Sequence, residues 1–299
     1  MAKAETPLVF EQIHIEVARN ATDDFNPFHD KNKWQQVRNN PFGGAIALGF
    51  QMECLLEYRL KLHREGNGEN ALIDQHDLRY SNYQFNFANA VRCGEALDIT
   101  IKPSQLREGD NTTLSNRVSL KADGRLALLG FKRESQQPLI LPEHETLPLA
   151  GLAARPSRGY LGDSGFYLVR KFIMNGNAKN FLSGSLAEQS DYIDELEERV
   201  NYPETYPCSL MSCLLLEQGV EDGLDFLANP LVYTAHKISI DRALLADLHS
   251  NDALHLLSKR VEAPEGERHF ECYGIVGEDR VLFRAEIALV SLASILGAG

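Results

Sequence analysis

Positive charge is scarce in this sequence. Its 299 residues contain 30 Lys and Arg against 42 Asp and Glu, which gives a formal net charge of −12 at pH 7. Nucleic acids and anionic membranes attract basic surfaces, so this acidic chain argues against both as the main partner. No apolar run approaches the roughly 18 residues that span a bilayer, and residues 1–7 lack the apolar core of a secretory signal. We therefore expect a cytoplasmic protein with no membrane partner.

Cysteine is also rare, and its spacing matches neither a metal site nor a disulfide framework. The five cysteines are Cys54, Cys93, Cys208, Cys213 and Cys272. Their number is odd, and the sequence has no Cys-x-x-Cys pair and no His cluster at metal-ligand spacing. We expect free thiols and no metal. Cys54 and Cys213 lie within apolar helical stretches, which is typical of small core residues rather than nucleophiles.

The most informative stretch is Asp24-Phe25-Asn26-Pro27-Phe28-His29. Proline cannot continue a helix and biases the preceding residue toward extended geometry, so Asn26-Pro27 predicts a tight turn. That turn would bring Asp24 and His29 to the same side. An acid and a base in one small space are what the addition or removal of water across a double bond requires. The same residues also allow a simpler interpretation, a capping Asp and a surface His.

Periodicity predicts a long helix and an antiparallel sheet in the first half. Apolar residues recur at three- and four-residue steps over residues 45–62, after the glycine-rich stretch 43–49, which predicts a helix with a wide apolar stripe. Residues 8–20 predict a strand or the entry to a helix. Strand-like segments bounded by turn residues follow at 78–87, 96–101, 112–120 and 125–132. We expect an α+β unit in which the helix covers one face of the sheet.

The second half repeats this pattern after a proline-rich stretch. Residues 135–160 predict a linker because they contain Pro138, Pro142, Pro148 and Pro156. Strand-like segments return at 231–240, 253–260, 268–276 and 280–292. Residues 178–180 match 18–20 at an offset of 160, and residues 211–215 match 52–56 at an offset of 159. We infer a duplication with a first unit at 1–134, a linker at 135–160 and a second unit at 161–299.

The repeat predicts one active site per chain. At these offsets the positions of Asp24, Asn26, His29 and Gly49 fall on Gly184, Leu186, Gln189 and Cys208. The second copy would then lack every polar group of the motif. We expect the site in the first half, with the second half as scaffold and substrate wall.

Asp24-x-Asn26-Pro27-x-His29, together with the later Gly44-Ala45-Ile46-Ala47-Leu48-Gly49, resembles the MaoC-like family of (R)-specific enoyl-CoA hydratases and hydroxyacyl-thioester dehydratases. The resemblance covers most of residues 10–133, where 85–101 is similar to the family's central strand-turn-strand. It implies the hot-dog fold, a long helix wrapped by an antiparallel sheet, and members with two units often keep one catalytic half. We expect an α+β double hot-dog that forms a pseudo-dimer within one chain, with further homodimerisation left open.

The resemblance implies reversible hydration of a 2-enoyl thioester to an (R)-3-hydroxyacyl thioester, with Asp24 and His29 acting on one water. Gly49, at the helix start, would aim its N–H at the thioester oxygen as an oxyanion hole, or would be a glycine kept for close packing. Asn26 and Pro27 would shape the turn. No cofactor is expected, because the thioester already acidifies the α-proton.

The thioester carrier, coenzyme A or an acyl carrier protein, would contact Lys31, Lys33 and Arg38, which follow His29 closely. Two departures from the family pattern stand next to the motif. Leu48 replaces a usual His, and Asp23 replaces a usual Gly and adds a second carboxylate.

Two other functions stay open from the sequence. A hot-dog acyl thioesterase would use Asp24 to direct water at the thioester carbonyl. A non-catalytic protein that binds acyl thioesters would agree with Leu48 and with the eroded second half.

Overall fold

A computed structural model describes residues 7–140 and 147–296 of the chain. The first half begins with a short strand and a helix, continues with a long helix, and ends in a sheet. Its helices are α1 (Gln12–Ala21), α2 (Gly49–Gly66) and α3 (Asn70–Gln75), with the 3₁₀ helices η1 (Pro27–His29) and η2 (Lys33–Gln36). Its strands are β1 (Leu8–Val9), β2 (Tyr80–Phe87), β3 (Ala96–Ile101), β4 (Gln105–Arg107), β5 (Thr113–Ala122) and β6 (Arg125–Ser135).

The second half repeats this order. Its main helices are α4 (Asn175–Gly184), α5 (Thr205–Ser209), α6 (Met211–Glu221), α7 (Arg242–Ala246) and α8 (Leu292–Leu296). Its strands are β7 (Arg158–Tyr160), β8 (Tyr167–Phe172), β9 (Ile193–Asp194), β10 (Arg199–Val200), β11 (Leu231–Asp241), β12 (Ala253–Val261), β13 (Glu267–Val276) and β14 (Arg280–Ser291). Four short 3₁₀ helices complete it: η3 (Leu152–Ala154), η4 (Gly162–Ser164), η5 (Gln189–Asp191) and η6 (Glu195–Glu197).

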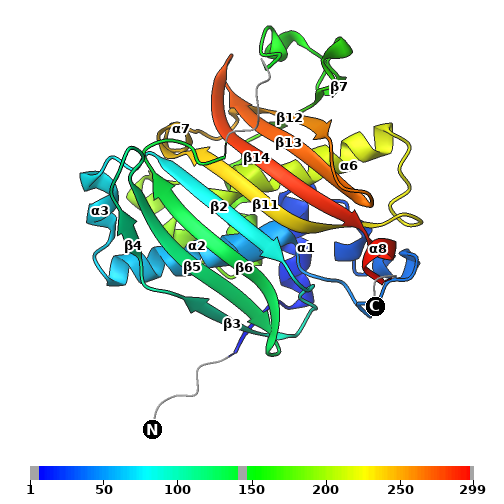
Figure 1. The fold of residues 1–299 in the computed structure, drawn as a ribbon, viewed down its shortest axis with the longest axis horizontal. Coiled ribbons are helices and arrows are strands. Elements are labelled where there is room, and N and C mark those ends of the chain that lie inside the picture. Colours follow the sequence, from blue (N-terminus) through cyan, green and yellow to red (C-terminus); the bar gives the residue numbers. More distant parts are fainter. Residues whose placement is uncertain (1–6, 141–146, 297–299) are drawn as a thin grey trace.

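The two halves share one 12-stranded sheet. Strands β2 and β11 pair antiparallel at its centre, from Tyr80 opposite Asp241 to Asn86 opposite Ala235. Outward from this seam the strand order is β2, β6, β5, β3 on one side and β11, β14, β13, β12 on the other. The two sides therefore have the same topology, related by an approximate twofold axis at the seam (Figure 1).

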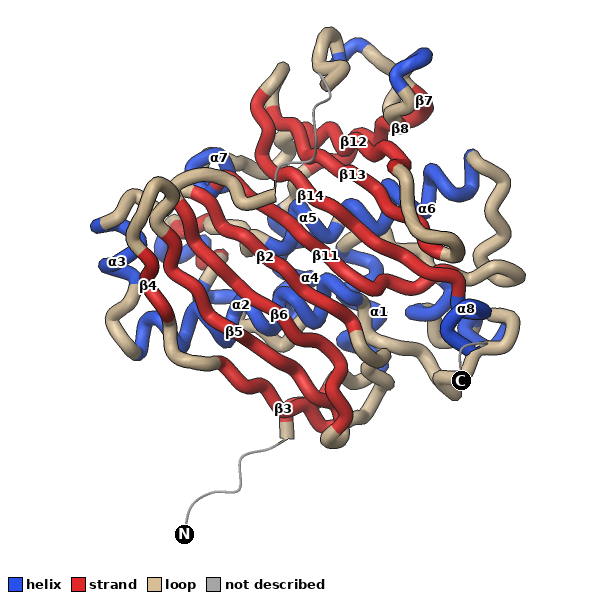
Figure 2. Tube along the Cα trace, viewed as in Figure 1, coloured by secondary structure: helices blue, strands red, loops and turns tan. Residues whose placement is uncertain are grey.

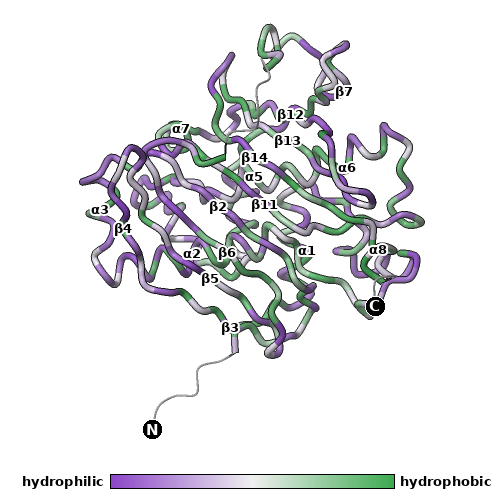
Figure 3. The backbone as a smooth tube through the Cα atoms, viewed as in Figure 1, coloured by the Kyte–Doolittle hydropathy of each residue, from purple (hydrophilic) through white to green (hydrophobic). Residues whose placement is uncertain are grey.

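The helices lie behind one face of this curved sheet (Figure 2). Along β5 burial alternates residue by residue, as expected for a strand with one face on the core, and hydropathy changes along the strands accordingly (Figure 3). One core cluster joins both halves, with Phe50 and Phe85 from the first and Tyr206 and Phe283 from the second. Each such buried side chain contributes roughly 1.5–3 kcal/mol relative to exposure.

Helices α1 and α4 cross in close contact. A Cβ built on Gly184 would lie 2.7 Å from the Ala18 backbone nitrogen, so only glycine allows the two helices to approach this closely. Gln51 reinforces the contact, because its side-chain amide donates to the Gly184 carbonyl oxygen at 2.6 Å. This packing fixes the end of α1, from which the Asp24 motif continues.

The predicted strands are present, with boundaries that differ by a few residues. Residues 8–20 form both of the structures that the sequence left open, β1 and then α1. The long helix begins at Gly49 rather than at Ala45, because Ile46 bridges Arg92 and the Ala47 N–H donates to the Val91 carbonyl. The predicted linker at 135–160 is not free of structure, because η3 lies within it and its last three residues form β7, which pairs with β8; residues 141–146 of this stretch lie outside the described residues. None of the described helices is long and apolar enough to cross a membrane.

Candidate functional site

The turn after α1 is held by its own polar side chains. Asp24 Oδ1 accepts a hydrogen bond from the Asn26 N–H at 2.9 Å, and Asn26 Oδ1 accepts one from the Phe28 N–H at 3.1 Å. Asn26 thereby caps η1, and Pro27 stands at its first position, where no N–H donor is needed. These hydrogen bonds turn the chain back on itself, so that His29 lies beside Asp24.

Asp24 and His29 are buried together, with 2% and 6% of their surfaces exposed. Asp24 Oδ2 lies 4.0 Å from His29 Nε2, which is too long for a direct hydrogen bond. His29 Nδ1 lies 2.8 Å from the Ile46 carbonyl oxygen. A carbonyl oxygen can only accept, so Nδ1 carries the proton. Nε2 is then the ring nitrogen that lies toward Asp24.

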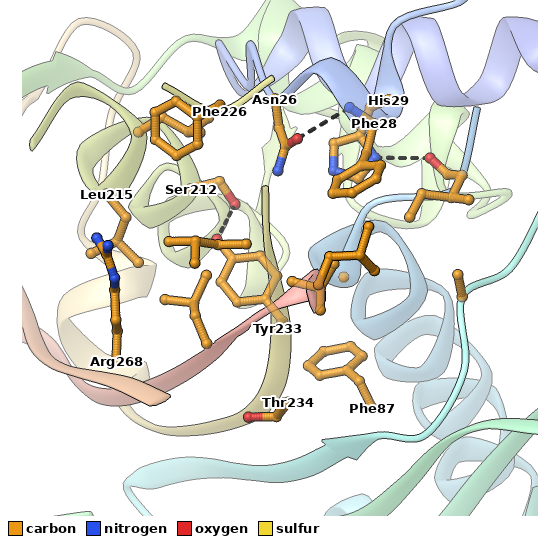
Figure 4. A pocket seen from close by; sticks show the side chains of 18 of the residues that line it. Asn26, Phe28, His29, Phe87, Ser212, Leu215, Phe226, Tyr233, Thr234 and Arg268 are labelled. Atoms are coloured by element: carbon orange, nitrogen blue, oxygen red, sulfur yellow. Dashed lines mark hydrogen bonds between the residues drawn. The ribbon is translucent and has the colours of Figure 1, made fainter. Parts of the chain in front are cut away.

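This pair faces a cavity of about 220 Å³ between the two halves. The first half contributes the motif, Gly49 and Phe87, and the second half contributes residues of α6, β11 and β13. Figure 4 shows Tyr233 and Phe87 on the side of the cavity that faces His29, and Arg268 at the opposite end. The cavity is mainly apolar with a few convergent polar groups, which is the usual character of a small-molecule site.

Gly49 is the first residue of α2 and lines the cavity. Throughout the part of the chain that the structure describes, its N–H has no hydrogen-bond acceptor. A Cβ at this position would lie 3.2 Å from Phe87 Cζ and 3.4 Å from Tyr233 Cδ2. A side chain here would therefore press on Phe87 unless that ring moved, and the first N–H of α2 lies at the lining of the cavity.

Tyr233 and Ser212 form a polar contact from the second half that sequence reasoning missed. Their hydroxyl oxygens lie 3.0 Å apart. Burial, and next the charge of Asp24, raise the pKa of Tyr233, so the phenol stays protonated. No motif marks either residue in the sequence, because their proximity to Asp24 arises only from the pairing of β11 with β2.

The three cations predicted to contact a carrier lie outside the cavity lining. Lys31, Lys33 and Arg38 are all exposed. Lys31 pairs with Glu16 at 3.5 Å, and the backbone N–H of Arg38 donates to the Leu227 carbonyl oxygen at 2.8 Å. The cations that line the cavity are Arg260 and Arg268, from the second half.

The two departures from the family pattern have separate consequences. Asp23 has a left-handed backbone with φ of 52° and turns outward, where Lys171 Nζ lies 3.1 Å from its carboxylate. Its charge is thus directed away from the cavity. Leu48 is buried and precedes α2 as its N-cap residue, so an apolar side chain occupies that position.

The second half contains a counterpart of the motif at a different offset from the predicted one. The first residues of α1 and α4 lie 163 positions apart in the sequence, and so do their last residues. The first residues of the capped 3₁₀ helices η1 and η5 lie 162 positions apart. Glu188 caps η5 as Asn26 caps η1. The counterparts of Asp24 and His29 are therefore Ala187 and Asp191, and Thr205 begins the second helix as Gly49 begins α2.

The mapping onto Gly184, Leu186, Gln189 and Cys208 was wrong because sequence matches of three and five residues are too short to locate insertions and deletions. The second copy keeps polar groups at two motif positions, Glu188 and Asp191. It lacks the acid and the imidazole, so the Asp/His pair occurs once in the two units.

A buried ionic cluster surrounds the second-half counterpart of the cavity, which has a volume of about 420 Å³. Lys132 Nζ lies 2.5 Å from Glu134 Oε1 and 3.0 Å from Glu204 Oε2, and Arg64 pairs with Glu134. Burial and the charge of Glu204 raise the pKa of Glu57 to about 7. Burial alone would also raise the pKa of Glu204, but Lys132 and Arg242 outweigh it and lower this pKa to about 2.

Replacing Lys132 by methionine should destabilise the fold by about 3–5 kcal/mol, because Glu134 and Glu204 would lose a buried partner. Urea unfolding measures this difference. Lys121→Met, on the exposed side of β5, is the control and should change the unfolding free energy by less than about 0.5 kcal/mol. Equal effects of the two substitutions would show that the cluster does not hold the halves together.

Comparison with known proteins identifies the fold. No family model matches the sequence, and no curated protein matches it significantly. Solved structures do match: a MaoC-like dehydratase has a TM-score of 0.60 at 11% identity, over 96% of each chain. The chain therefore has the double hot-dog fold, and the predicted resemblance to MaoC-like dehydratases is confirmed at the level of the fold.

Two further solved structures share this fold. A conserved hypothetical protein of Mycobacterium tuberculosis, described as a double hot-dog, has a TM-score of 0.58 at 10% identity, over 97% of this chain and 94% of that one. The full-length peroxisomal multifunctional enzyme type 2 of Drosophila melanogaster has a TM-score of 0.53 at 11% identity, over 95% of this chain and 48% of that one. The pseudo-dimer within one chain, expected from the repeat, agrees with these matches.

Proposed function

We propose that this protein adds water to a 2-enoyl thioester, and in reverse removes it from an (R)-3-hydroxyacyl thioester, at Asp24 and His29. One observation carries the proposal. The Ile46 carbonyl oxygen binds His29 at Nδ1, which leaves the other ring nitrogen, Nε2, 4.0 Å from Asp24 Oδ2 at the cavity surface. One water can hydrogen-bond to both atoms and be held for attack.

Hydration at this pair conserves its protons. One O–H bond of the water breaks as its oxygen bonds to the β-carbon, and the proton passes to the Asp24–His29 pair. The pair returns a proton to the α-carbon from the same face, so it ends in its initial protonation state. Electron density that moves onto the thioester oxygen is stabilised by the Gly49 N–H at the positive end of α2.

The cavity supports a thioester with an apolar acyl part. Phe87, Leu215 and Leu289 provide apolar walls from both halves. Whether the carrier is coenzyme A or an acyl carrier protein is a separate question, because either presents the same thioester to the pair. The chemistry requires no cofactor beyond this carrier, and among the described residues no group of three or more His, Cys, Asp or Glu side chains could hold a metal ion.

The test is a hydration assay over 2-enoyl-CoA substrates of increasing chain length. The expected result is loss of the enoyl absorbance and formation of the (R)-3-hydroxyacyl product, without release of thiol. Thiol release with an unchanged enoyl group would instead identify a thioesterase. Saturable binding with neither reaction would identify a protein that only binds acyl thioesters.

A further inference from the structure

Two arginines meet at the end of the cavity opposite the motif. Arg260 stands near the end of β12, and Arg268 near the start of β13; both line the cavity. Arg260 pairs with Phe270 across the strands, and Arg268 precedes Phe270 by two residues. Side chains two residues apart on a strand point to the same face, so the two guanidinium groups and the Phe270 ring share one face of the sheet.

Neither guanidinium group has a hydrogen bond or ion pair with any residue in the described ranges 7–140 and 147–296. Burial, and next the positive charge of Arg260, lower the pKa of Arg268, while Asp222 acts in the opposite direction. Asp222 also lines the cavity and accepts a hydrogen bond from the Tyr160 hydroxyl at 2.5 Å. Two like charges thus converge in a chain whose net charge is −12, and an anion between them would relieve their repulsion.

The sheet register connects the arginines to the reaction site. Tyr233 on β11 pairs with Leu289 on β14, and Leu289 pairs with Arg268 on β13. These three side chains form a row across neighbouring strands, which places Arg268 about 10 Å from Tyr233 by the usual strand spacing. Tyr233 borders Gly49. A ligand with its thioester at Gly49 can therefore extend over Leu289 and reach Arg268, since all three residues line the cavity.

We propose that Arg260 and Arg268 bind an anionic group of the thioester substrate and thereby determine which thioesters are accepted. The inference rests on the proposed hydration at Asp24 and His29. Guanidinium groups form paired, charge-assisted hydrogen bonds with carboxylate and phosphate oxygens. The anionic group is either a phosphate of the carrier or a carboxylate at the far end of the acyl chain, and both share this chemistry.

The test compares wild type with the double variant Arg260→Gln/Arg268→Gln on three substrates. These are a 2-enoyl-CoA, the same enoyl group on uncharged pantetheine, and a pantetheine thioester whose enoyl chain ends in a carboxylate. We expect KM to rise about tenfold or more for a substrate with the recognised anion, with kcat nearly unchanged and the neutral thioester unaffected. An effect on the CoA substrate identifies carrier phosphate, and an effect on the carboxylate substrate identifies the acyl chain.

The control Arg107→Gln/Arg117→Gln removes two exposed arginines from β4 and β5 and should leave all three KM values unchanged. Equal KM changes for the neutral and anionic substrates, or no change for any, would overturn the proposal.

A binding measurement keeps this test separate from the proposed reaction. Titration calorimetry with saturated, unreactive analogues of the three thioesters measures Kd without turnover. If wild type turns over none of the enoyl substrates, the hydration proposal fails. The arginine proposal is then tested separately: it is supported if the double variant weakens binding of an anionic analogue but not of the neutral one, and overturned if it does not.

Discussion

Replacing Asp24 by asparagine should lower kcat/KM for enoyl hydration by about 10²–10⁴-fold. The substitution keeps the size of the side chain, and the amide oxygen can still accept the Asn26 N–H hydrogen bond that shapes the turn. It removes the carboxylate charge and the proton-accepting Oδ2 atom that faces His29 Nε2. The measurement is the initial rate of enoyl absorbance loss, with the thermal midpoint as a check that the variant is folded.

The adjacent residue gives a matched control. Asp23→Asn makes the same chemical change one position earlier, on a carboxylate that faces Lys171 rather than the cavity. Asparagine also tolerates the left-handed backbone at this position. We expect Asp23→Asn to retain activity within about threefold of wild type. If the two variants lose activity equally, or if Asp24→Asn keeps near-normal activity, the proposed role of Asp24 is wrong.

At His29 two substitutions separate the functions of the two ring nitrogens. Asparagine places its amide nitrogen near the Nδ1 position and can donate to the Ile46 carbonyl, whereas glutamine reaches the Nε2 position. Neither supplies a basic nitrogen at Nε2, so both should lower kcat/KM by about 10²–10⁴-fold. Loss of the buried hydrogen bond to Ile46 should cost His29→Gln about 1–3 kcal/mol of stability, and His29→Asn should lose less.

Rates and chemical unfolding are measured on the same preparations. His249→Ala, at an exposed histidine, controls for the removal of an imidazole elsewhere in the chain and should change neither quantity. A fully active His29→Asn would show that the Nε2 atom takes no part in the reaction. If the loss of kcat/KM in each His29 variant is proportional to its loss of unfolding free energy, the role of His29 is structural alone.

The sequence predicted the strands well because their signals are local. Burial alternates residue by residue along β3 and β5, while β12 and β13 are rich in apolar residues and largely buried, and Gly, Asp or Asn residues form the turns that join β5 to β6 and β13 to β14. The start of α2 was harder to predict. Apolar spacing extends back to Ala45, while a long-range hydrogen bond from the Ala47 N–H to the Val91 carbonyl keeps Ala47 outside the helix. Periodicity contains no information about such a partner.

The same limit applies to the site. Asp24, Asn26, Pro27 and His29 could be found because one short turn holds them together. The second wall of the cavity could not, since Tyr233 reaches Asp24 only through the pairing of β11 with β2, and Arg268 only through the pairing of β13 with β14. The carrier contacts predicted at Lys31, Lys33 and Arg38 followed proximity in sequence, whereas the cations that line the cavity come from the other half of the chain.

The two halves have diverged in the chemistry of equivalent cavities. The first keeps a buried carboxylate and imidazole with apolar walls, while the second encloses Arg64, Lys132 and three glutamates in a dense ionic cluster. Charge pairs of this kind hold the halves in one arrangement when every partner is present. We infer that the second cavity stabilises the pseudo-dimer on which the first cavity depends, because the first site takes one of its walls from the second half.

In the proposed reaction, Asp24 and His29 together add the hydroxyl group and a proton of water to the same face of one double bond. Hydration of a 2-enoyl-CoA in D₂O, followed by determination of the configuration at both carbons, tests this directly. We predict an (R)-3-hydroxyacyl product with deuterium at the α-carbon on the same face as the new hydroxyl. Deuterium on the opposite face, a mixture of both, or no hydration at all would contradict the assignment of Asp24 and His29 to this reaction.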